Sequence, residues 1–244
     1  KKKKTSAFNG HILATSFENN ESKVSLLPFE DDQSLKSQIA KEENLTRIHS
    51  IALKAGMLKT KNNFEGFLLK GVSKDFDWSS LSSFITQGRF PNLEKETPSV
   101  ELLISETLAD RLGLSLGQKV DAYFQNQSGA GLPNRRRFTF VGVYLSGFPD
   151  SDQNLIYGDL RIVQRLNKWK SNQIGGYEIF VSDFKDVNAT ANRIYEILPS
   201  DLNCSSITDR FSGIFQWIAL FDFNVLIILV VIEPSELLLC AEII

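Results

Sequence analysis

The residue types best suited to enzymatic or metal chemistry are scarce in this chain of 244 residues. It has two histidines, His11 and His49, and two cysteines, Cys204 and Cys240. Neither histidine lies in an H-E-x-x-H pattern, and there is no C-x-x-C pair. Each histidine falls in a short apolar segment typical of a strand, where a half-exposed structural role is the favoured interpretation. We therefore expect no catalytic residue, no metal site and no cofactor.

Two pairs of acids are the remaining candidates for metal or acid–base chemistry. They are Asp75 with Asp77, and Asp150 with Asp152. Neither pair has a convergent third ligand in the sequence, so solvated turns are the favoured interpretation. Nucleotide-binding patterns are missing as well, since the chain contains no G-x-G-x-x-G and no Walker loop. A soluble enzyme with its cleft around His49 or the second acid pair is kept as an alternative.

The overall composition is that of an ordinary globular protein. Hydrophobic residues make up 42% of the chain, and 27 Lys+Arg stand against 29 Asp+Glu, for a formal net charge of −2. Nucleic-acid-binding domains usually carry a basic surface, so this balance argues against a nucleic-acid partner. Two cysteines are too few for a disulfide framework.

The two ends of the sequence differ from the rest. The chain opens with four lysines that no apolar segment follows, which excludes a signal peptide. Residues 225–232 are uninterruptedly apolar, but the run stops at Glu233 and Pro234, short of the roughly 20 residues of a bilayer span. We interpret 211–232 as the start of a transmembrane helix, with a buried terminal helix as the alternative. Segments 1–7 and 233–244 are interpreted as ends foreign to the natural protein, with a solvated juxtamembrane tail as the alternative for the four lysines.

The elements that would position these residues follow from apolar periodicity and turn signals. Strands are predicted at 11–17, 23–29, 46–58, 64–72, 99–104, 119–124, 137–144, 154–157, 177–181 and 203–207. Helices are predicted at 35–41, 105–112, 159–168 and 186–198. Strand–helix–strand units at both ends predict an α+β fold, in which 8–70 and 174–210 form a split βαβ subdomain and 71–173 a β-rich insertion. Both chain ends would then emerge near each other, as in a domain inserted between two membrane helices.

A run of motifs then points to a known family. Residues 104–120 read Ile-Ser-Glu-Thr-Leu-Ala-Asp-Arg-Leu-Gly-Leu-Ser-Leu-Gly-Gln-Lys-Val. This run resembles the signature of the periplasmic domain of MacB/FtsX-like ABC transporter permeases. Further similar stretches occur in the same order at 69–72, 138–144, 152–157 and 215–222. The resemblance covers nearly all of 8–232 and is closest to the lipoprotein-releasing permeases of the LolC/LolE type. Most matched residues are apolar or glycine, so the motif identifies a fold rather than a site.

This resemblance implies a fold, a location and partners. The fold would be a porter-like split βαβ subdomain with an inserted, sabre-like strand-rich subdomain, its ends adjacent to membrane helices. The domain would face the periplasm from the inner (plasma) membrane, and a separate cytoplasmic ATPase subunit would hydrolyse ATP. Further partners would be a second permease subunit, in a homodimer or heterodimer, and a lipoprotein or its periplasmic carrier chaperone.

The implied function is non-catalytic. The domain would couple ATP-driven motion to the release or hand-over of lipoproteins at the inner membrane. The alternative is MacB-like export, or FtsX-like regulation of a cell-wall hydrolase, by the same class of domain.

The resemblance also suggests a binding loop. In LolC-type members a hooked loop captures the chaperone. The segment at the corresponding place in this sequence, between the predicted strands 119–124 and 137–144, is 125–136. Six residues of this segment resemble the family's Gly-x-Ile-Pro pattern and are the candidate partner-binding residues: Gly131, Leu132, Pro133, Asn134, Arg135 and Arg136. Guanidinium groups suit carboxylate or phosphate partners. The alternative is a solvated connection whose arginines discourage pairing at a strand edge.

A second candidate contact is aromatic. Phe76, Trp78 and Phe84 fall within nine residues of each other in a predicted loop. Exposed, they would contact acyl chains or a partner; buried, they would form a small satellite core under the loop.

Overall fold

The computed structural model describes residues 10–20, 22–60, 63–126 and 132–211. In these residues ten strands form one sheet in the order β12-β1-β11-β3-β4-β9-β6-β8-β5, and β7 pairs with β3 and β8. The strands are β1 (Ile12–Ser16), β3 (Leu45–Lys59), β4 (Phe64–Val72), β5 (Ile85–Gly88), β6 (Glu101–Ser105), β7 (Lys119–Phe124), β8 (Asn134–Tyr144), β9 (Leu155–Asp159), β11 (Gly176–Val181) and β12 (Leu202–Ser206). β2 (Phe29–Glu30) and β10 (Gln173–Ile174) form a separate pair.

Helices and short 3-10 turns connect these strands. The α-helices are α2 (Gln33–Ile39), α3 (Glu106–Leu112), α4 (Pro149–Asn154), α5 (Leu160–Leu166), α6 (Val187–Ile197) and α7 (Ile207–Arg210). The 3-10 turns are η1 (Phe17–Asn19), η2 (Trp78–Phe84) and η3 (Phe184–Asp186). The predicted α+β class is therefore confirmed.

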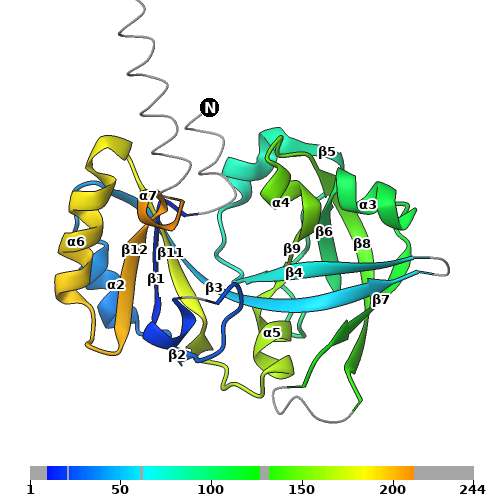
Figure 1. Ribbon diagram of the computed structural model, residues 1–244, viewed down its shortest axis with the longest axis horizontal. Coiled ribbons are helices and arrows are strands. Elements are labelled where there is room, and N and C mark those ends of the chain that lie inside the picture. The colour runs from blue at the N-terminus through cyan, green and yellow to red at the C-terminus, as the bar shows by residue number, and fades with distance from the viewer. Residues whose placement is uncertain (1–9, 21, 61–62, 127–131, 212–244) are drawn as a thin grey trace, which may run out of the picture.

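One half of the molecule, here called the small half, contains both ends of the described chain. Its strands run β12-β1-β11-β3, each antiparallel to its neighbour. The units β1–α2–β3 and β11–α6–β12 interleave, because β11 of the second unit lies between β1 and β3 of the first. Helices α2 and α6 lie side by side against this part of the sheet (Figure 1). This is the predicted split βαβ arrangement.

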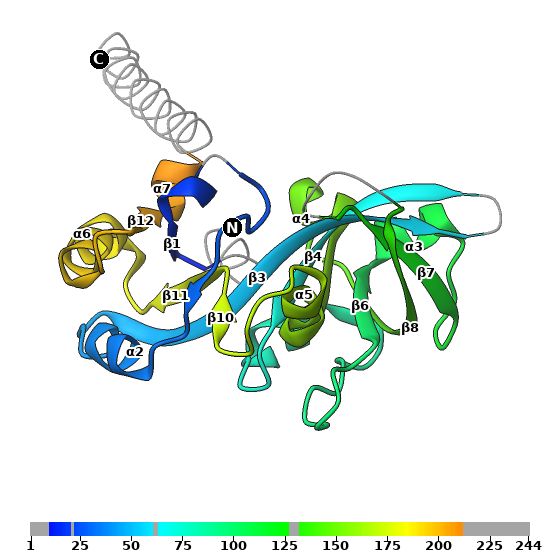
Figure 2. The same cartoon turned by 90° about the horizontal axis from the view of Figure 1, so that it is seen from below.

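The other half, here called the inserted half, comprises the elements from β4 to β9. The strand β3 joins the halves, because its residues 45–51 pair with β11 and its residues 51–59 pair with β4. Figure 2 shows β3 running from the small half across to the inserted half. Within the insertion β4 pairs with β9 in parallel, and β6 pairs with β8 in parallel. The division of the chain at residues 70 and 174 stays a prediction.

The signature motif forms a capped helix, as the sequence predicts. Ser105 precedes α3 and its hydroxyl accepts a hydrogen bond from the backbone N–H of Leu108 at 3.2 Å. Gly113 ends the helix with φ +62°, a left-handed conformation that favours glycine. Leu108 and Leu112 are buried under the sheet. The motif residues therefore build the core and the turn that leads to β7.

The predicted strand at 23–29 is wrong, since only Phe29 and Glu30 pair as a strand there. The reason is the buried side chain of Asn19. Its amide oxygen accepts from the backbone N–H groups of Leu26 and Leu27 at 2.8 and 3.0 Å, and its nitrogen donates to the carbonyl of Leu27 at 2.8 Å. These bonds occupy backbone groups that a strand ladder would need.

Other boundaries differ less. The polar residues 149–154 form the short helix α4 rather than a turn, and β8 begins at Asn134, three residues before the predicted start. Residues 85–88 form a strand, β5, that has no clear alternation in the sequence.

The two ends of the described chain meet. The guanidinium of Arg210 donates to the carbonyl of Gly10 at 2.7 Å, and the N–H of Ile207 donates to the carbonyl of His11 at 2.7 Å. None of the helices in the described ranges is long and apolar enough to cross a membrane. Apart from Phe211, the predicted membrane segment 211–232 lies outside the described residues, as do 1–7 and 233–244.

Candidate functional site

Both histidines occupy structural positions, His11 just before β1 and His49 within β3. The Nδ1 of His11 accepts a hydrogen bond from the backbone N–H of Val181 at 2.8 Å. His49 is 5% exposed and lies between the rings of Phe76 and Phe180, with centroid distances of 4.7 and 5.6 Å. Burial is the main cause that lowers the pKa of both imidazoles, so both are neutral at pH 7. Across the described residues, no three His, Cys, Asp or Glu side chains gather as a metal site would require.

One acid of each pair, Asp152 and Asp77, holds the backbone of a turn or helix end, whereas the side chain of Asp150 lies outside the described part of the structure. The buried carboxylate of Asp152 accepts from the N–H groups of Ser146 and Gly147 at 2.9 and 2.8 Å. Asp77 caps η2 by accepting from the N–H of Ser79 at 2.8 Å, and it is paired with Arg47. Although burial opposes the shift, these hydrogen bonds lower the pKa of Asp77 to about 2. Both carboxylates are therefore engaged in holding the backbone.

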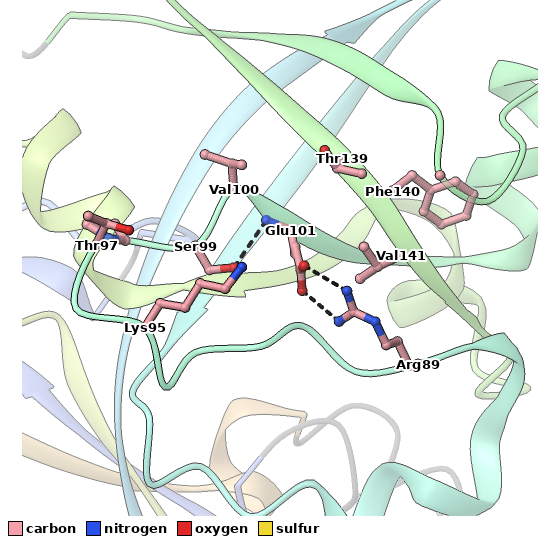
Figure 3. A pocket seen from close by; sticks show the side chains of 11 residues that line it. Arg89, Lys95, Thr97, Ser99, Val100, Glu101, Thr139, Phe140 and Val141 are labelled. Atoms are coloured by element: carbon pink, nitrogen blue, oxygen red, sulfur yellow. Dashed lines mark hydrogen bonds and ion pairs between the residues drawn. The ribbon is translucent and has the colours of Figure 1, made fainter.

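A surface pocket of about 470 Å³ lies between the loop at residues 89–99 and strands β6 and β8 (Figure 3). Its acid, Glu101, forms a two-pronged pair with Arg89, with both N–O distances at 2.7 Å. Glu101 also accepts from the N–H of Asn92 at 2.8 Å, and the hydrogen bonds from Arg89 lower its pKa. Because both of its oxygens are engaged, Glu101 anchors the loop and is not a free base.

The candidate binding loop lies at the start of β8. Gly131 lies outside the described residues, whereas Leu132 is 89% exposed. The side-chain nitrogen of Asn126 donates to the carbonyl of Leu132 at 2.7 Å, and Asn134 in turn donates to the side-chain oxygen of Asn126. These bonds link the backbone of Leu132 to the side chains of Asn126 and Asn134.

The arginines of this loop are split between two faces. Arg135 and Arg137 point to one face of β8 and both pair with Asp121 on β7, at 2.7 and 2.8 Å. These two arginines lower the pKa of Asp121 to about 2. Arg136 alternates to the opposite face and is exposed. The charges of Arg135 and Arg137 are thus partly balanced within the sheet.

The aromatic residues differ in exposure. Phe76 is 5% exposed and belongs to a buried cluster on one face of the sheet, with Tyr157 and Ile51. Trp78 packs edge-on against Phe76 at 4.7 Å and stacks on Phe90 at 4.8 Å, and it is half-buried, as is Phe84. Contact of these residues with an acyl chain or a partner stays a prediction. Of the three, Trp78 and Phe84 are partly exposed and could make such a contact.

The sequence reasoning missed a buried group of charges. Lys70 on β4 and Glu178 on β11 are paired at 2.6 Å, with side chains only 2% and 4% exposed. The half-buried Arg210, at the end of α7, interacts electrostatically with Glu178. The available signal was Lys70 in the apolar run 67–72 and Glu178 in the apolar run 176–181, since such charges need a partner to be buried.

Comparisons with known proteins identify the fold. No family model and no curated protein matches the chain. The extracellular domain of the noncanonic ABC-type transporter YknZ from Gram-positive bacteria is similar, with a TM-score of 0.51, 14% identity, and coverage of 81% of this chain and 100% of that one. The periplasmic region of MacB from Actinobacillus actinomycetemcomitans has a TM-score of 0.55, 14% identity, and coverage of 86% and 94%. These similarities confirm the MacB-like fold and do not single out lipoprotein-releasing permeases.

Proposed function

We propose that this chain is the extracytoplasmic domain of an ABC transporter permease. The observation that carries the proposal is the arrangement of the fold. A split βαβ half holds both described ends together at Gly10 and Arg210, and a strand-rich half is inserted between β3 and β11. The domains of YknZ and MacB have this fold. A domain whose ends leave side by side is suited to insertion between two membrane helices.

In this role the domain transmits ATP-driven motion and catalyses no reaction itself. A separate ATPase subunit in the cytoplasm supplies the energy, and the domain works with a second permease subunit at the inner membrane. Two features support a non-catalytic role. Both histidines are neutral structural residues, and the carboxylates of Asp77, Asp152 and Glu101 are engaged by backbone or arginine donors.

The cargo we propose is a lipoprotein, handed over to a carrier or released at the membrane. The support is the sequence resemblance to LolC/LolE-type permeases together with the exposed side chain of Leu132. This side chain offers an apolar contact point beside the arginines at the start of β8. Export of the MacB type or control of a cell-wall hydrolase is the second candidate, favoured by the structural similarity to MacB.

Photo-crosslinking in cells tests this proposal. A benzophenone amino acid would replace Leu132 or Trp78 in the full-length protein, and the crosslinked species would be identified by mass spectrometry. Leu116, an exposed leucine elsewhere in the inserted half, is the matched control position. We expect a lipoprotein or its carrier from Leu132 and none from Leu116. Capture of only an efflux adaptor or a hydrolase contradicts the lipoprotein assignment, and failure of an ATPase subunit to co-purify contradicts the permease assignment.

A further inference from the structure

A second pocket lies where the partners of β3 change along its length. On the side of β3 away from β4, Leu53 exchanges two hydrogen bonds with Ser25, both at 2.9 Å. The pairing with β7 begins only at Met57. Ala55 lies between these two positions and lines the pocket, which has a volume of about 420 Å³. Pockets of this size hold small ligands, so this place in the sheet has room for one.

The lining of this pocket comes from separate parts of the chain. Val24 and Leu26 provide apolar surface from the loop before β2, and Leu26 is 56% exposed. Asn126 follows β7, and its side-chain amide is held by bonds to the carbonyl of Leu132 and to Asn134. The pocket therefore combines apolar surface with a few polar groups, as ligand sites usually do.

Asn167, the residue that ends α5, also lines this pocket. It is 2% exposed, and neither its side-chain nitrogen nor its side-chain oxygen has a hydrogen-bond partner among the described residues. A buried amide without partners is costly, and such groups are rare in protein interiors. A donor beside an acceptor is the complement of a peptide group, whose carbonyl accepts and whose N–H donates. Asn167 is therefore suited to bind a peptide group of a ligand.

The charged residue of the pocket is Lys54 of β3, which is half-buried. Among the described residues Lys54 forms no ion pair, and none of those that line the pocket is an acid. Burial lowers the pKa of Lys54. A half-buried lysine without a counter-charge favours an anionic ligand. The carboxyl end of a peptide has such a charge directly beside a peptide group.

We propose that this pocket binds a short peptide by its free carboxyl end. Lys54 pairs with the terminal carboxylate, and Asn167 bonds the peptide group that precedes it. Val24 and Leu26 contact the side chain of the last residue, so the ligand ends in an apolar residue. The inference goes beyond the proposed function, because it rests only on the residues of this pocket.

Isothermal titration calorimetry of the full chain with two peptides tests this site. The probes are acetyl-Ala-Ala-Leu with a free carboxylate and the same peptide with its carboxyl end amidated. We expect the free acid to bind at least about tenfold more tightly, because a hydrogen bond to a charged group contributes more than a neutral one. Equal binding of the two peptides, or binding of neither, overturns the proposal. Either of these results would leave the permease assignment standing, since that assignment does not depend on this pocket.

Variants then test the role of each residue. Lys54→Met should abolish the preference for the free acid, whereas Lys59→Met, an exposed position on the same strand outside this pocket, should keep it. An unchanged preference in Lys54→Met contradicts the pairing with the carboxylate. Asn167→Leu should weaken the binding of both peptides about tenfold without lowering the melting temperature of the free chain, since it removes an unpaired buried amide. A lower melting temperature with unchanged affinity would show that Asn167 is structural and would overturn its role. The comparison of the two peptides on the parent chain needs no variant, so it decides the proposal even if a variant fails to fold.

Discussion

Removing the charge of Glu178 should strongly destabilise the fold. In Glu178→Gln the side chain keeps its size, so no cavity forms, but the fully buried ammonium of Lys70 loses the negative charge that lies 2.6 Å away. Breaking a buried ion pair by removing one member costs about 3–5 kcal/mol. Since 1 kcal/mol shifts the melting temperature by about 2–4 °C in a chain of this size, we expect a decrease of roughly 6–20 °C.

The loss of stability in Glu178→Gln should also depend on pH. Burial lowers the pKa of Lys70 below its ordinary value of 10.5, and Glu178 opposes this shift. Without Glu178 the pKa of Lys70 in the folded state falls further. At pH values between that pKa and 10.5, the unfolded chain therefore binds more protons than the folded chain. Stability of the variant then rises with pH up to the unfolded value of 10.5, more steeply than that of the parent. The deficit should therefore shrink as the pH rises toward 10.5.

Urea denaturation followed by circular dichroism measures both effects. The matched control is Glu42→Gln, which breaks the exposed pair between Arg193 and Glu42. Exposed pairs contribute only about 0–1 kcal/mol, so this variant should unfold almost as the parent does. A deficit for Glu178→Gln below about 1 kcal/mol, or one that grows as the pH rises toward 10.5, would refute the reasoning.

Three further predictions concern single side chains. Asn19→Ala should cost about 1–3 kcal/mol and speed amide exchange in the loop at residues 24–28, since Asn19 bonds that backbone; unchanged exchange would contradict its clamping role. Phe76→Ala should cost about 3–5 kcal/mol in urea unfolding because the ring is buried, and a cost near zero would mean that the ring is exposed in solution. The carboxyl of Asp121 should titrate by NMR near pH 2, and in Arg137→Gln its midpoint should move toward 3.8. Because this folded pKa is lowered, the stability that Asp121 contributes is lost as pH falls from about 4 to about 2, and an unshifted midpoint in the variant would refute the pairing.

The elements with a strong local signal could be predicted from the sequence. The capped helix α3, the long strand β3 and the split βαβ order follow from caps, alternation and the spacing of strands. The failure at residues 23–29 has a specific cause. Those residues are apolar enough to suggest a strand, but the amide of Asn19 takes up the backbone groups of Leu26 and Leu27, and nothing in the local pattern reveals that contact.

The buried pair of Lys70 and Glu178 could not be predicted from local sequence patterns for a similar reason. Lys70 and Glu178 are 108 residues apart and reach each other only because β3 brings β4 and β11 to its two sides. The sequence shows each as a single charge in an apolar run, which predicts a partner but does not name it. Exposure of the aromatic loop residues likewise depends on which strands lie beneath them. Phe76 is covered because it packs on His49 of β3 and Tyr157 of β9.

The most direct test of the account asks on which side of the membrane the domain lies. The full-length protein would carry Leu132→Cys as its single accessible thiol, with Cys204 and Cys240 replaced by serine, in intact spheroplasts treated with a membrane-impermeant maleimide. Because Leu132 is 89% exposed, its replacement should react at once if the domain faces outward. We predict labelling before lysis, and labelling that occurs only after lysis would contradict the assignment of this chain as an extracytoplasmic permease domain.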